Sequence, residues 1–246
     1  MKIRRKTENE GASLRHEQSQ LLTTNNDFFV REAYKSLRTN VMFSLTEDKE
    51  NQVIMVTSSM PSEGKSTTSV NLALSLSEAG KKTLLIDCDM RKPKIGRLLK
   101  IKNPKGLSDA LFNKDKSESV LSHITNTELY VLPAGSIPPN PSELLGSKRM
   151  KNLVDSLRES FDYIILDMPP INVVTDAVVA SPLADGVLMV VRSGVSERNA
   201  VLRAMDLLER ANAKILGVVL TCVKRENRSY GGYHNKNYGY ENAGAE

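Results

Sequence analysis

Residues 57–68 read TSSMPSEGKSTT and join an apolar run at 53–57 to a helical pattern at 65–79. The letters GKS at 64–66 match the end of a phosphate-binding loop, whose backbone N–H groups cradle phosphates. In such a loop the lysine reaches the β and γ oxygens, and the hydroxyl coordinates Mg²⁺. The alternative is an ordinary helix start rich in serine and threonine. We expect a nucleotide to contact the following residues: Ser59, Pro61, Ser62, Glu63, Gly64, Lys65, Ser66 and Thr67.

Three aspartates follow two other apolar runs. Asp87 and Asp89 close the first of these runs, and Asp167 ends the run at 163–167. Open α/β sheets bind their ligands at the carboxyl ends of the strands. Because carboxylates beside a triphosphate repel it unless a cation lies between them, these residues imply Mg²⁺. The alternative for Asp87 and Asp89 is a turn with Arg91 as a surface partner.

Short apolar runs alternate with helical patterns along most of the chain. Several runs are apolar at nearly every position, which is typical of parallel strands covered on both faces. This alternation predicts an α/β fold with a parallel sheet and helices on both faces, and the loop at 57–68 makes it a P-loop (phosphate-loop) NTPase fold. The expected strands are 53–57, 83–87, 129–132, 163–167, 186–191 and 216–220, and the expected helices are 28–44, 65–79, 147–160 and 196–212.

Two terminal segments differ from this core in composition. Residues 1–26 are polar and mixed in charge, so we expect a flexible arm. Residues 224–246 have almost no aliphatic side chains, so we expect a mobile tail. The P-loop domain then spans 27–223. The tail carries four of the seven tyrosines: Tyr230, Tyr233, Tyr238 and Tyr240.

The composition excludes several classes of protein. The 246 residues are 40% apolar and 26% charged, close to an average globular domain. No apolar run approaches the about 18 residues that cross a bilayer, and the start has no hydrophobic signal core, so we expect a cytoplasmic protein. Cys88 and Cys222 are too few for a disulfide framework or a zinc site. Aromatic residues make up only 5% and tryptophan is absent, so we expect no nucleic-acid partner despite the net charge of +5.

Taken together, the phosphate loop, the run LLIDCDMR at 84–91 and the strand ending at Asp167 resemble the bacterial tyrosine kinases. The tyrosine-rich tail completes the set. The segment GSIPPNPSELL at 135–145 resembles one that is typical of the capsule and exopolysaccharide members. Two loop residues replace glycines of the usual pattern: Ser59 and Ser62.

The resemblance implies transfer of the γ-phosphoryl group of ATP to tyrosine. Lys65 then stabilises the transferring phosphoryl group, while Asp89 supports the water shell of the metal. Asp87 accepts the tyrosine proton, because a phenol of pKa about 10 is mostly protonated at pH 7. Arg91 is left with two possible roles, orienting one of these aspartates or balancing phosphate charge. The implied catalytic residues are Lys65, Asp87, Asp89 and Arg91, and the implied Mg²⁺ ligands are Ser66, Asp89 and Asp167.

In this family a Glu-x-x-Arg-x-x-Arg stripe on the first helix makes a ring-forming contact, matched here by Glu32, Lys35 and Arg38. Spacing alone favours a solvated Glu–Lys pair worth about 0.2–0.5 kcal/mol. The family match indicates self-association into a ring-like homo-oligomer, and the lysine lacks the bidentate fork of arginine.

The resemblance also implies partners and a cellular role. The tail tyrosines are the expected autophosphorylation sites, and other proteins are expected as tyrosine substrates. Gram-positive members are separate from a membrane adaptor, so we expect the adaptor's cytoplasmic segment to recruit this chain to the inner face of the membrane. The expected role is regulation of capsular or exopolysaccharide synthesis and export.

Two other functions stay open. A partition or septum-positioning ATPase has the same fold, but it carries a signature lysine where this chain has Met60. A regulatory subunit that binds ATP without kinase activity is the other alternative, although every expected carboxylate is present.

Overall fold

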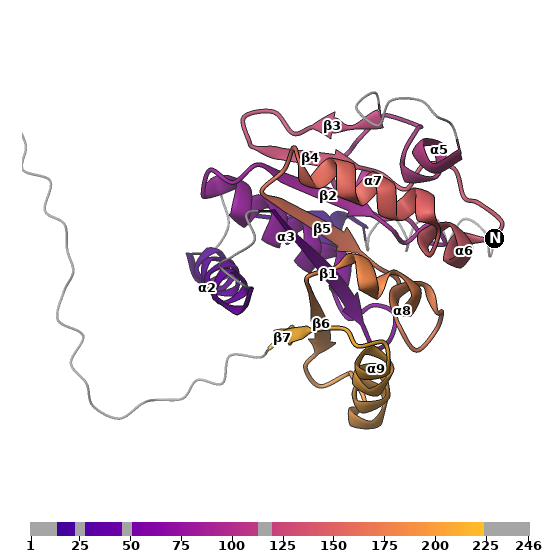
Figure 1. The fold of residues 1–246 in the computed structure, drawn as a ribbon. Coiled ribbons are helices and arrows are strands. Elements are labelled where there is room, and N and C mark those ends of the chain that lie inside the picture. The colour runs from indigo at the N-terminus through magenta and orange to yellow at the C-terminus, as the bar shows by residue number, and fades with distance from the viewer. Residues whose placement is uncertain (1–13, 23–27, 46–50, 113–119, 224–246) are drawn as a thin grey trace, which may run out of the picture.

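The computed structural model describes residues 14–22, 28–45, 51–112 and 120–223. A seven-stranded sheet runs through the domain in the order β3-β4-β2-β5-β1-β6-β7 (Figure 1). Neighbouring strands are parallel except for the antiparallel pair β3 and β4. The strands are β1 (Gln52–Ser58), β2 (Thr83–Asp87), β3 (Ser122–His123), β4 (Leu129–Leu132), β5 (Tyr163–Asp167), β6 (Gly186–Arg192) and β7 (Ile215–Thr221).

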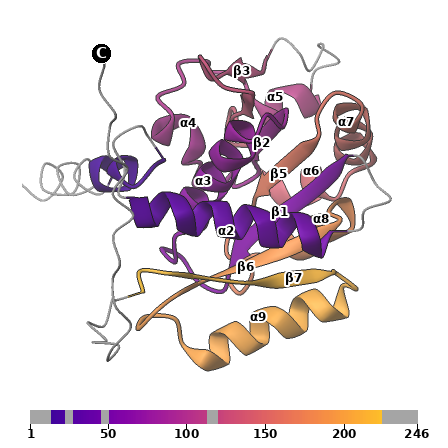
Figure 2. The same ribbon diagram turned by 90° about the vertical axis from the view of Figure 1, so that its left-hand side faces the viewer.

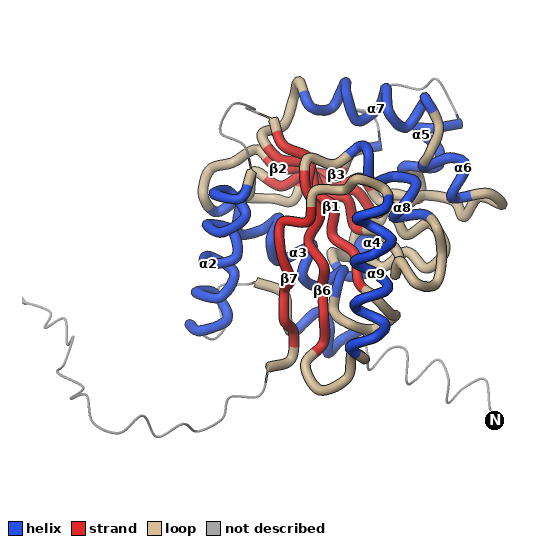
Figure 3. Tube along the Cα trace, turned by 60° about the horizontal axis from the view of Figure 1, so that its bottom comes forward, coloured by secondary structure: helices blue, strands red, loops and turns tan. Residues whose placement is uncertain are grey.

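Helices cover both faces of the sheet (Figure 2). The helices are α2 (Phe28–Ser44), α3 (Lys65–Glu78), α4 (Ile95–Leu98), α5 (Leu107–Phe112), α6 (Pro141–Leu145), α7 (Lys148–Arg158), α8 (Asp176–Ala180), the 3₁₀ turn η2 (Ser181–Leu183) and α9 (Arg198–Arg210). One apolar cluster joins the sheet to α2, α3 and α4, and a second joins it to α5 through α9. In Figure 3 the strands lie between α2 on one side and α7, α8 and α9 on the other. Among the described residues, no helix has both the length and the apolarity to span a bilayer.

The predicted architecture is confirmed. Every residue of β1, β2 and β5 is buried, because these strands lie in the middle of the sheet under helices on both sides. Strands covered in this way must be apolar at successive positions, which is why their sequence pattern was continuous rather than alternating. The observed bounds of β2, β4 and β5 are those expected from the sequence.

The strand β3 was not predicted. It consists of two residues that pair antiparallel with β4, at the edge of the sheet. His123 lies opposite Tyr130, and the two ring centroids are 4.7 Å apart. A strand of this length has too few residues to give a hydrophobic period.

Part of the expected N-terminal arm packs on the domain. From the sequence we expect residues 1–26 to be flexible, but residues 14–22 begin with a short helix and end with a buried Leu22. The Asn71 side chain of α3 accepts a hydrogen bond from the Leu22 amide at 2.7 Å and donates one to the Gln20 carbonyl at 3.0 Å. Because both the backbone and the buried amide are satisfied by this pairing, the segment is an ordered part of the domain.

Candidate active site

The carboxyl ends of β1, β2 and β5 meet at one edge of the sheet. Asp87 ends β2 and lies in register with Asp167, which ends β5. Asp167 is also in register with Val56 of β1, and the phosphate loop follows directly after β1 and leads into α3. The parallel sheet therefore brings the loop and the predicted aspartates to one place.

The phosphate loop presents a row of free backbone N–H groups. Within the described ranges, no protein acceptor receives the amides of residues 62–67, and the first helical bond runs from Thr68 N–H to the Gly64 carbonyl at 2.9 Å. Gly64 has φ +98°, and a Cβ there would lie 3.2 Å from Thr221, so the position requires glycine. Free N–H groups at the start of a long helix form an anion site. The loop therefore suits the phosphates of a nucleotide.

Lys65 lies among the carboxylates. Its Nζ is 3.1 Å from Asp89 Oδ2 and 3.4 Å from Asp167 Oδ2. Burial alone would lower the pKa of Lys65, but the charges of Asp167, Asp89 and Asp87 outweigh burial and raise that pKa. The ammonium group is therefore held in its charged form beside the phosphate loop.

Asp87 is fully buried at the centre of the site. Its carboxylate accepts hydrogen bonds from three backbone N–H groups, those of Asp89 at 3.2 Å, Lys94 at 3.1 Å and Ile95 at 3.0 Å. Burial first, and then the neighbouring charge of Asp167, raise the pKa of Asp87 to about 7. A carboxylate of that pKa is a stronger base than an ordinary aspartate and is suited to accept a proton near neutral pH.

The oxygen donors at this edge fit Mg²⁺. Ser66 Oγ donates a hydrogen bond to Asp167 Oδ2 at 2.7 Å, and the carboxylates of Asp89 and Asp167 both contact the Lys65 ammonium. In the described ranges, no three acidic, histidine or cysteine side chains form a metal site of their own. Because Mg²⁺ usually takes one or two carboxylates and completes its shell with water and phosphate oxygens, this open set suits a metal that arrives with the nucleotide.

Arg91 contacts a different aspartate from those expected. From the sequence we expect it to orient Asp87 or Asp89, or to balance phosphate charge. Its guanidinium instead forms a bidentate pair with Asp176 of α8, with both N–O distances 3.0 Å, and these hydrogen bonds raise the pKa of Arg91. The fully buried Asp176 also accepts the hydroxyl of Ser142. Arg91 therefore ties the loop after β2 to α6 and α8.

The residues of α2 that are predicted to contact another protomer do not all point to the solvent. Lys35 Nζ pairs with Glu32 Oε1 at 2.7 Å, and both side chains are nearly half exposed. Arg38 turns inward and donates to the carbonyl oxygen of Ser75 on α3 at 2.6 Å. Glu32 and Lys35 thus form an exposed pair, whereas Arg38 holds α2 against α3.

The predicted phosphorylation sites, Tyr230, Tyr233, Tyr238 and Tyr240, lie outside the described residues. The other tyrosines pack in the domain. Tyr163 is buried in β5, and the Tyr130 ring lies 5.4 Å from the ring of Phe161. Tyr34 is half-buried on α2, and burial raises the pKa of its hydroxyl.

Comparison with known proteins identifies the family. A family model described as an AAA domain matches residues 51–214. Tyrosine-protein kinase YwqD of Bacillus subtilis is 39% identical over 203 residues, which are 82% of this chain and 85% of the relative. Tyrosine-protein kinase CpsD of Streptococcus agalactiae is 38% identical over 205 residues, which are 83% of this chain and 88% of the relative. The chain belongs to the bacterial tyrosine-protein kinases.

Solved structures that are similar to this chain have the same fold. The kinase domain of the Escherichia coli tyrosine kinase ETK gives a TM-score of 0.76 at 34% identity, over 86% of this chain and 80% of that chain. The chimerical protein CapA2B2 gives 0.72 at 40% identity, over 76% of this chain and 82% of that chain. The septum site-determining protein MinD of Pyrococcus horikoshii, at 24% identity and a TM-score of 0.60, shares the fold. The predicted P-loop NTPase fold and the resemblance to bacterial tyrosine kinases are both confirmed.

Residues outside the motifs of the kinase family complete the loop. Ser196, in the connection between β6 and α9, donates a hydrogen bond to the Glu63 carboxylate. Thr221 at the end of β7 donates to the Glu63 carbonyl at 2.7 Å. No motif marks either residue. The available signal is topological, because parallel strands all end at one edge of the sheet, and β6, with β7 beyond it, lies beside β1 and therefore ends near the loop that follows β1.

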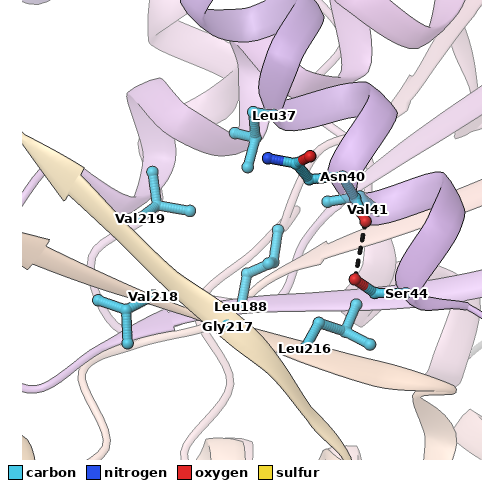
Figure 4. Close-up of a pocket in the computed structure, with 9 residues that line it drawn as sticks. All are labelled: Leu37, Asn40, Val41, Ser44, Leu188, Leu216, Gly217, Val218 and Val219. Atoms are coloured by element: carbon cyan, nitrogen blue, oxygen red, sulfur yellow. Dashed lines mark hydrogen bonds between the residues drawn. The ribbon is translucent and has the colours of Figure 1, made fainter.

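The pocket between α2 and β7 does not suit a nucleotide (Figure 4). The Ser44 hydroxyl on its rim donates to the Asn40 carbonyl at 2.7 Å. The pocket is lined by Leu37, Asn40, Val41, Ser44, Leu188, Leu216, Gly217, Val218 and Val219. Because no charged residue is among them, the pocket has nothing to balance a triphosphate, and we assign the nucleotide to the loop.

Replacing Ser62 with glycine should raise the free energy of unfolding by about 0.5–1 kcal/mol. Ser62 has φ +66°, a left-handed conformation that costs an L-residue about 1–2 kcal/mol and costs glycine little. Part of this gain is offset because glycine loses more backbone entropy than serine on folding. Denaturant unfolding measures the change. Ser36→Gly, on the exposed face of α2, is the matched control and should have the opposite sign. A loss of stability in Ser62→Gly would contradict the interpretation that the backbone is strained at Ser62.

Proposed function

We propose that this chain transfers the γ-phosphoryl group of ATP to tyrosine hydroxyls. The observation that carries the proposal is the convergence of free loop amides, a charged lysine and a buried aspartate of raised pKa at one edge of the sheet. The first two features bind and polarise phosphates, and the third supplies a proton acceptor. A nucleotide-binding protein without kinase activity would need only the first two.

In the proposed reaction the tyrosine oxygen attacks the γ-phosphorus and the bond to the β–γ bridging oxygen breaks, which leaves ADP. The phenolic proton passes to the carboxylate of Asp87. The Lys65 ammonium and the N–H groups of residues 62–67 stabilise charge on the phosphoryl oxygens. Mg²⁺, when bound with the nucleotide, neutralises further phosphate charge, and Ser66, Asp89 and Asp167 are the residues that would hold it.

Incubation of the purified chain with Mg·ATP, followed by phosphotyrosine detection, tests this function. We expect phosphotyrosine on the protein itself. Release of inorganic phosphate without phosphotyrosine would favour a partition or septum-type ATPase, although Met60 occupies the position of that class's signature lysine. Nucleotide binding with neither product would favour a regulatory subunit.

The cellular role proposed here rests on the family resemblance. Members of the capsule and exopolysaccharide type regulate polymer synthesis and export through a membrane adaptor. We propose the same role for this chain, recruited to the inner face of the membrane by the adaptor's cytoplasmic segment and acting on other proteins. Co-sedimentation with vesicles carrying that segment, compared with bare vesicles, tests the recruitment.

Self-association through α2 predicts that Glu32→Ala with Lys35→Ala shifts the protein toward monomer. These two side chains are exposed and form only a local pair, so their loss removes contacts to another protomer while Arg38 still holds α2 on α3. Light scattering measures the mass. The matched control removes the exposed pair Lys151 and Asp155 of α7. Equal masses for wild type and the α2 variant would mean that Glu32 and Lys35 form a solvated pair with no role in assembly.

Autophosphorylation is proposed for the tail tyrosines. Incubation with Mg·ATP should place phosphate on Tyr230, Tyr233, Tyr238 and Tyr240. Tyr130 and Tyr163 are packed in strands and would have to leave the sheet to reach a phosphate. Mass spectrometry locates the phosphate, with Tyr130→Phe as the control that should not lower the total. Phosphate mainly on Tyr34, Tyr130 or Tyr163 would contradict the assignment.

A further inference from the structure

Glu63 places a carboxylate inside the phosphate loop, where a negative charge opposes phosphate binding. Its side chain is almost completely buried, with 2% exposed. The two carboxylate oxygens accept the Ser59 hydroxyl at 2.8 and 3.0 Å and the Met60 amide at 3.0 Å, and one of them also accepts the Ser196 hydroxyl. All of these partner groups are hydrogen-bond donors, so the buried carboxylate has its acceptor oxygens satisfied. The loop therefore retains an acidic residue that the ligand does not need.

The carboxylate holds the turn that shapes the loop. Ser62 and Gly64, on either side of Glu63, both have positive φ, which folds the Glu63 side chain back over the start of the loop. There it meets Ser59, the residue that stands where the usual pattern has its first glycine. A hydroxyl–carboxylate bond across the loop fixes a conformation that other phosphate loops reach through the freedom of glycine.

The same carboxylate joins the loop to the neighbouring strands. Ser196, which donates to Glu63, also accepts the Arg192 amide at 2.8 Å at the end of β6. The Arg192 guanidinium donates to the Ser62 carbonyl at 3.2 Å. The loop is thus tied to the β6–α9 connection by both side chain and backbone, on the side opposite Asp87 and β2.

We infer that Glu63 is a positioning residue that keeps the loop in its phosphate-binding shape before the nucleotide arrives. With the carboxylate present, the Met60 amide and the Ser59 hydroxyl are satisfied inside the protein, and the amides of residues 62–67 stay free for phosphate. Without it, these buried donors must find other partners, and the loop must reorganise each time a nucleotide binds. The inference rests on the proposed function only in that the loop binds a nucleotide.

Calorimetric titration of the full chain with Mg·ADP tests the inference. Glu63→Ala should weaken binding by about 10- to 100-fold, the range that one or two unsatisfied buried donors imply. Glu63→Gln retains an acceptor oxygen and the side-chain shape while it removes the repelling charge, so it should bind within about threefold of wild type or more tightly. This rescue separates an acceptor role from a general loss of stability.

Asp185→Ala is the matched control. The Asp185 carboxylate also accepts a backbone amide, that of Val53 at 2.7 Å, and pairs with Arg158 at 2.6 Å, but at the amino end of β1. It should lower the melting temperature while Mg·ADP affinity stays unchanged. If Glu63→Ala does not fold, Ser196→Ala provides the second measurement and should weaken Mg·ADP binding by about three- to tenfold, as the loss of one hydrogen bond implies.

Two results would overturn the positioning role. One is wild-type Mg·ADP affinity in Glu63→Ala, or in Ser196→Ala where the first variant does not fold. The other is an equal loss of affinity in Glu63→Ala and Asp185→Ala, which would make the effect one of stability alone. A wild-type chain that binds Mg·ADP but forms no phosphotyrosine would refute the kinase proposal and leave this inference standing.

Discussion

Replacing Lys65 with methionine should reduce phosphotyrosine formation at least about 100-fold, the loss expected when a preorganised group that stabilises the transition state is removed. The Lys65 ammonium lies at the start of α3, between the loop and the carboxylates of Asp89 and Asp167. Methionine preserves most of the length and the apolar stem but carries no charge. The initial rate at saturating Mg·ATP measures the effect.

The same substitution should also destabilise the nucleotide-free protein. Asp87, Asp89 and Asp167 are all buried, and Lys65 is the cation that contacts two of them. Removing one partner of a buried ion pair typically costs about 3–5 kcal/mol, because the remaining charge is left in a poorly solvated place. We therefore expect a lower melting temperature without nucleotide as well as the loss of activity.

Lys214→Met is the control for both effects. Lys214 is exposed and precedes β7 at the end of the sheet away from the phosphate loop. Its rate and melting temperature should match wild type. A Lys65→Met variant that keeps more than about a tenth of the wild-type rate would rule out the assigned role, since one such donor contributes more than that factor.

The sheet could be predicted from the sequence because its central strands are buried on both faces. β5 before its final aspartate, and β2 between Thr83 and its final aspartate, are apolar at successive positions, and that pattern has few other solutions. The docking of residues 14–22 could not be predicted in this way. It depends on Asn71, a polar residue on α3 whose partners lie about 50 residues earlier, as the separations of 49 and 51 positions show. Nothing local in either segment signals the other.

The candidate site likewise contains residues that the sequence predicts and residues that it does not. Lys65, Ser66 and the aspartates were found because each follows a strand in a spacing that phosphate chemistry requires. Asp176 could not be predicted because it opens a short helix that belongs to none of the motifs and acts through Arg91. Arg91 had been recognised, but sequence spacing gave no information on which carboxylate it faces.

Asp87→Asn should lower the rate of phosphoryl transfer by about 100- to 10,000-fold, the usual contribution of a general base. The carboxylate has its pKa raised to about 7 by burial and by Asp167, so in its ionised form it is basic enough to accept the phenolic proton as the phosphoryl group arrives. An amide cannot take that proton. Mg·ADP should still bind, because the loop amides and Lys65 remain. Single-turnover rates and calorimetric titration give the two quantities.

A purely structural role for Asp87 predicts a different pair of results. Its oxygens accept the amides of Asp89, Lys94 and Ile95, and an asparagine turns an N–H₂ toward some of these donors. That mismatch would lower the melting temperature and weaken Mg·ADP binding along with the rate. Asp162→Asn provides the comparison, since Asp162 accepts only the Lys82 amide among the hydrogen bonds of its carboxylate in the described chain, at the amino end of β2. If Asp87→Asn loses Mg·ADP affinity in proportion to rate and also melts at a lower temperature, Asp87 chiefly holds the site in shape and is not the proton acceptor. If the rate alone falls and Asp162→Asn keeps the wild-type rate, Asp87 is the proton acceptor.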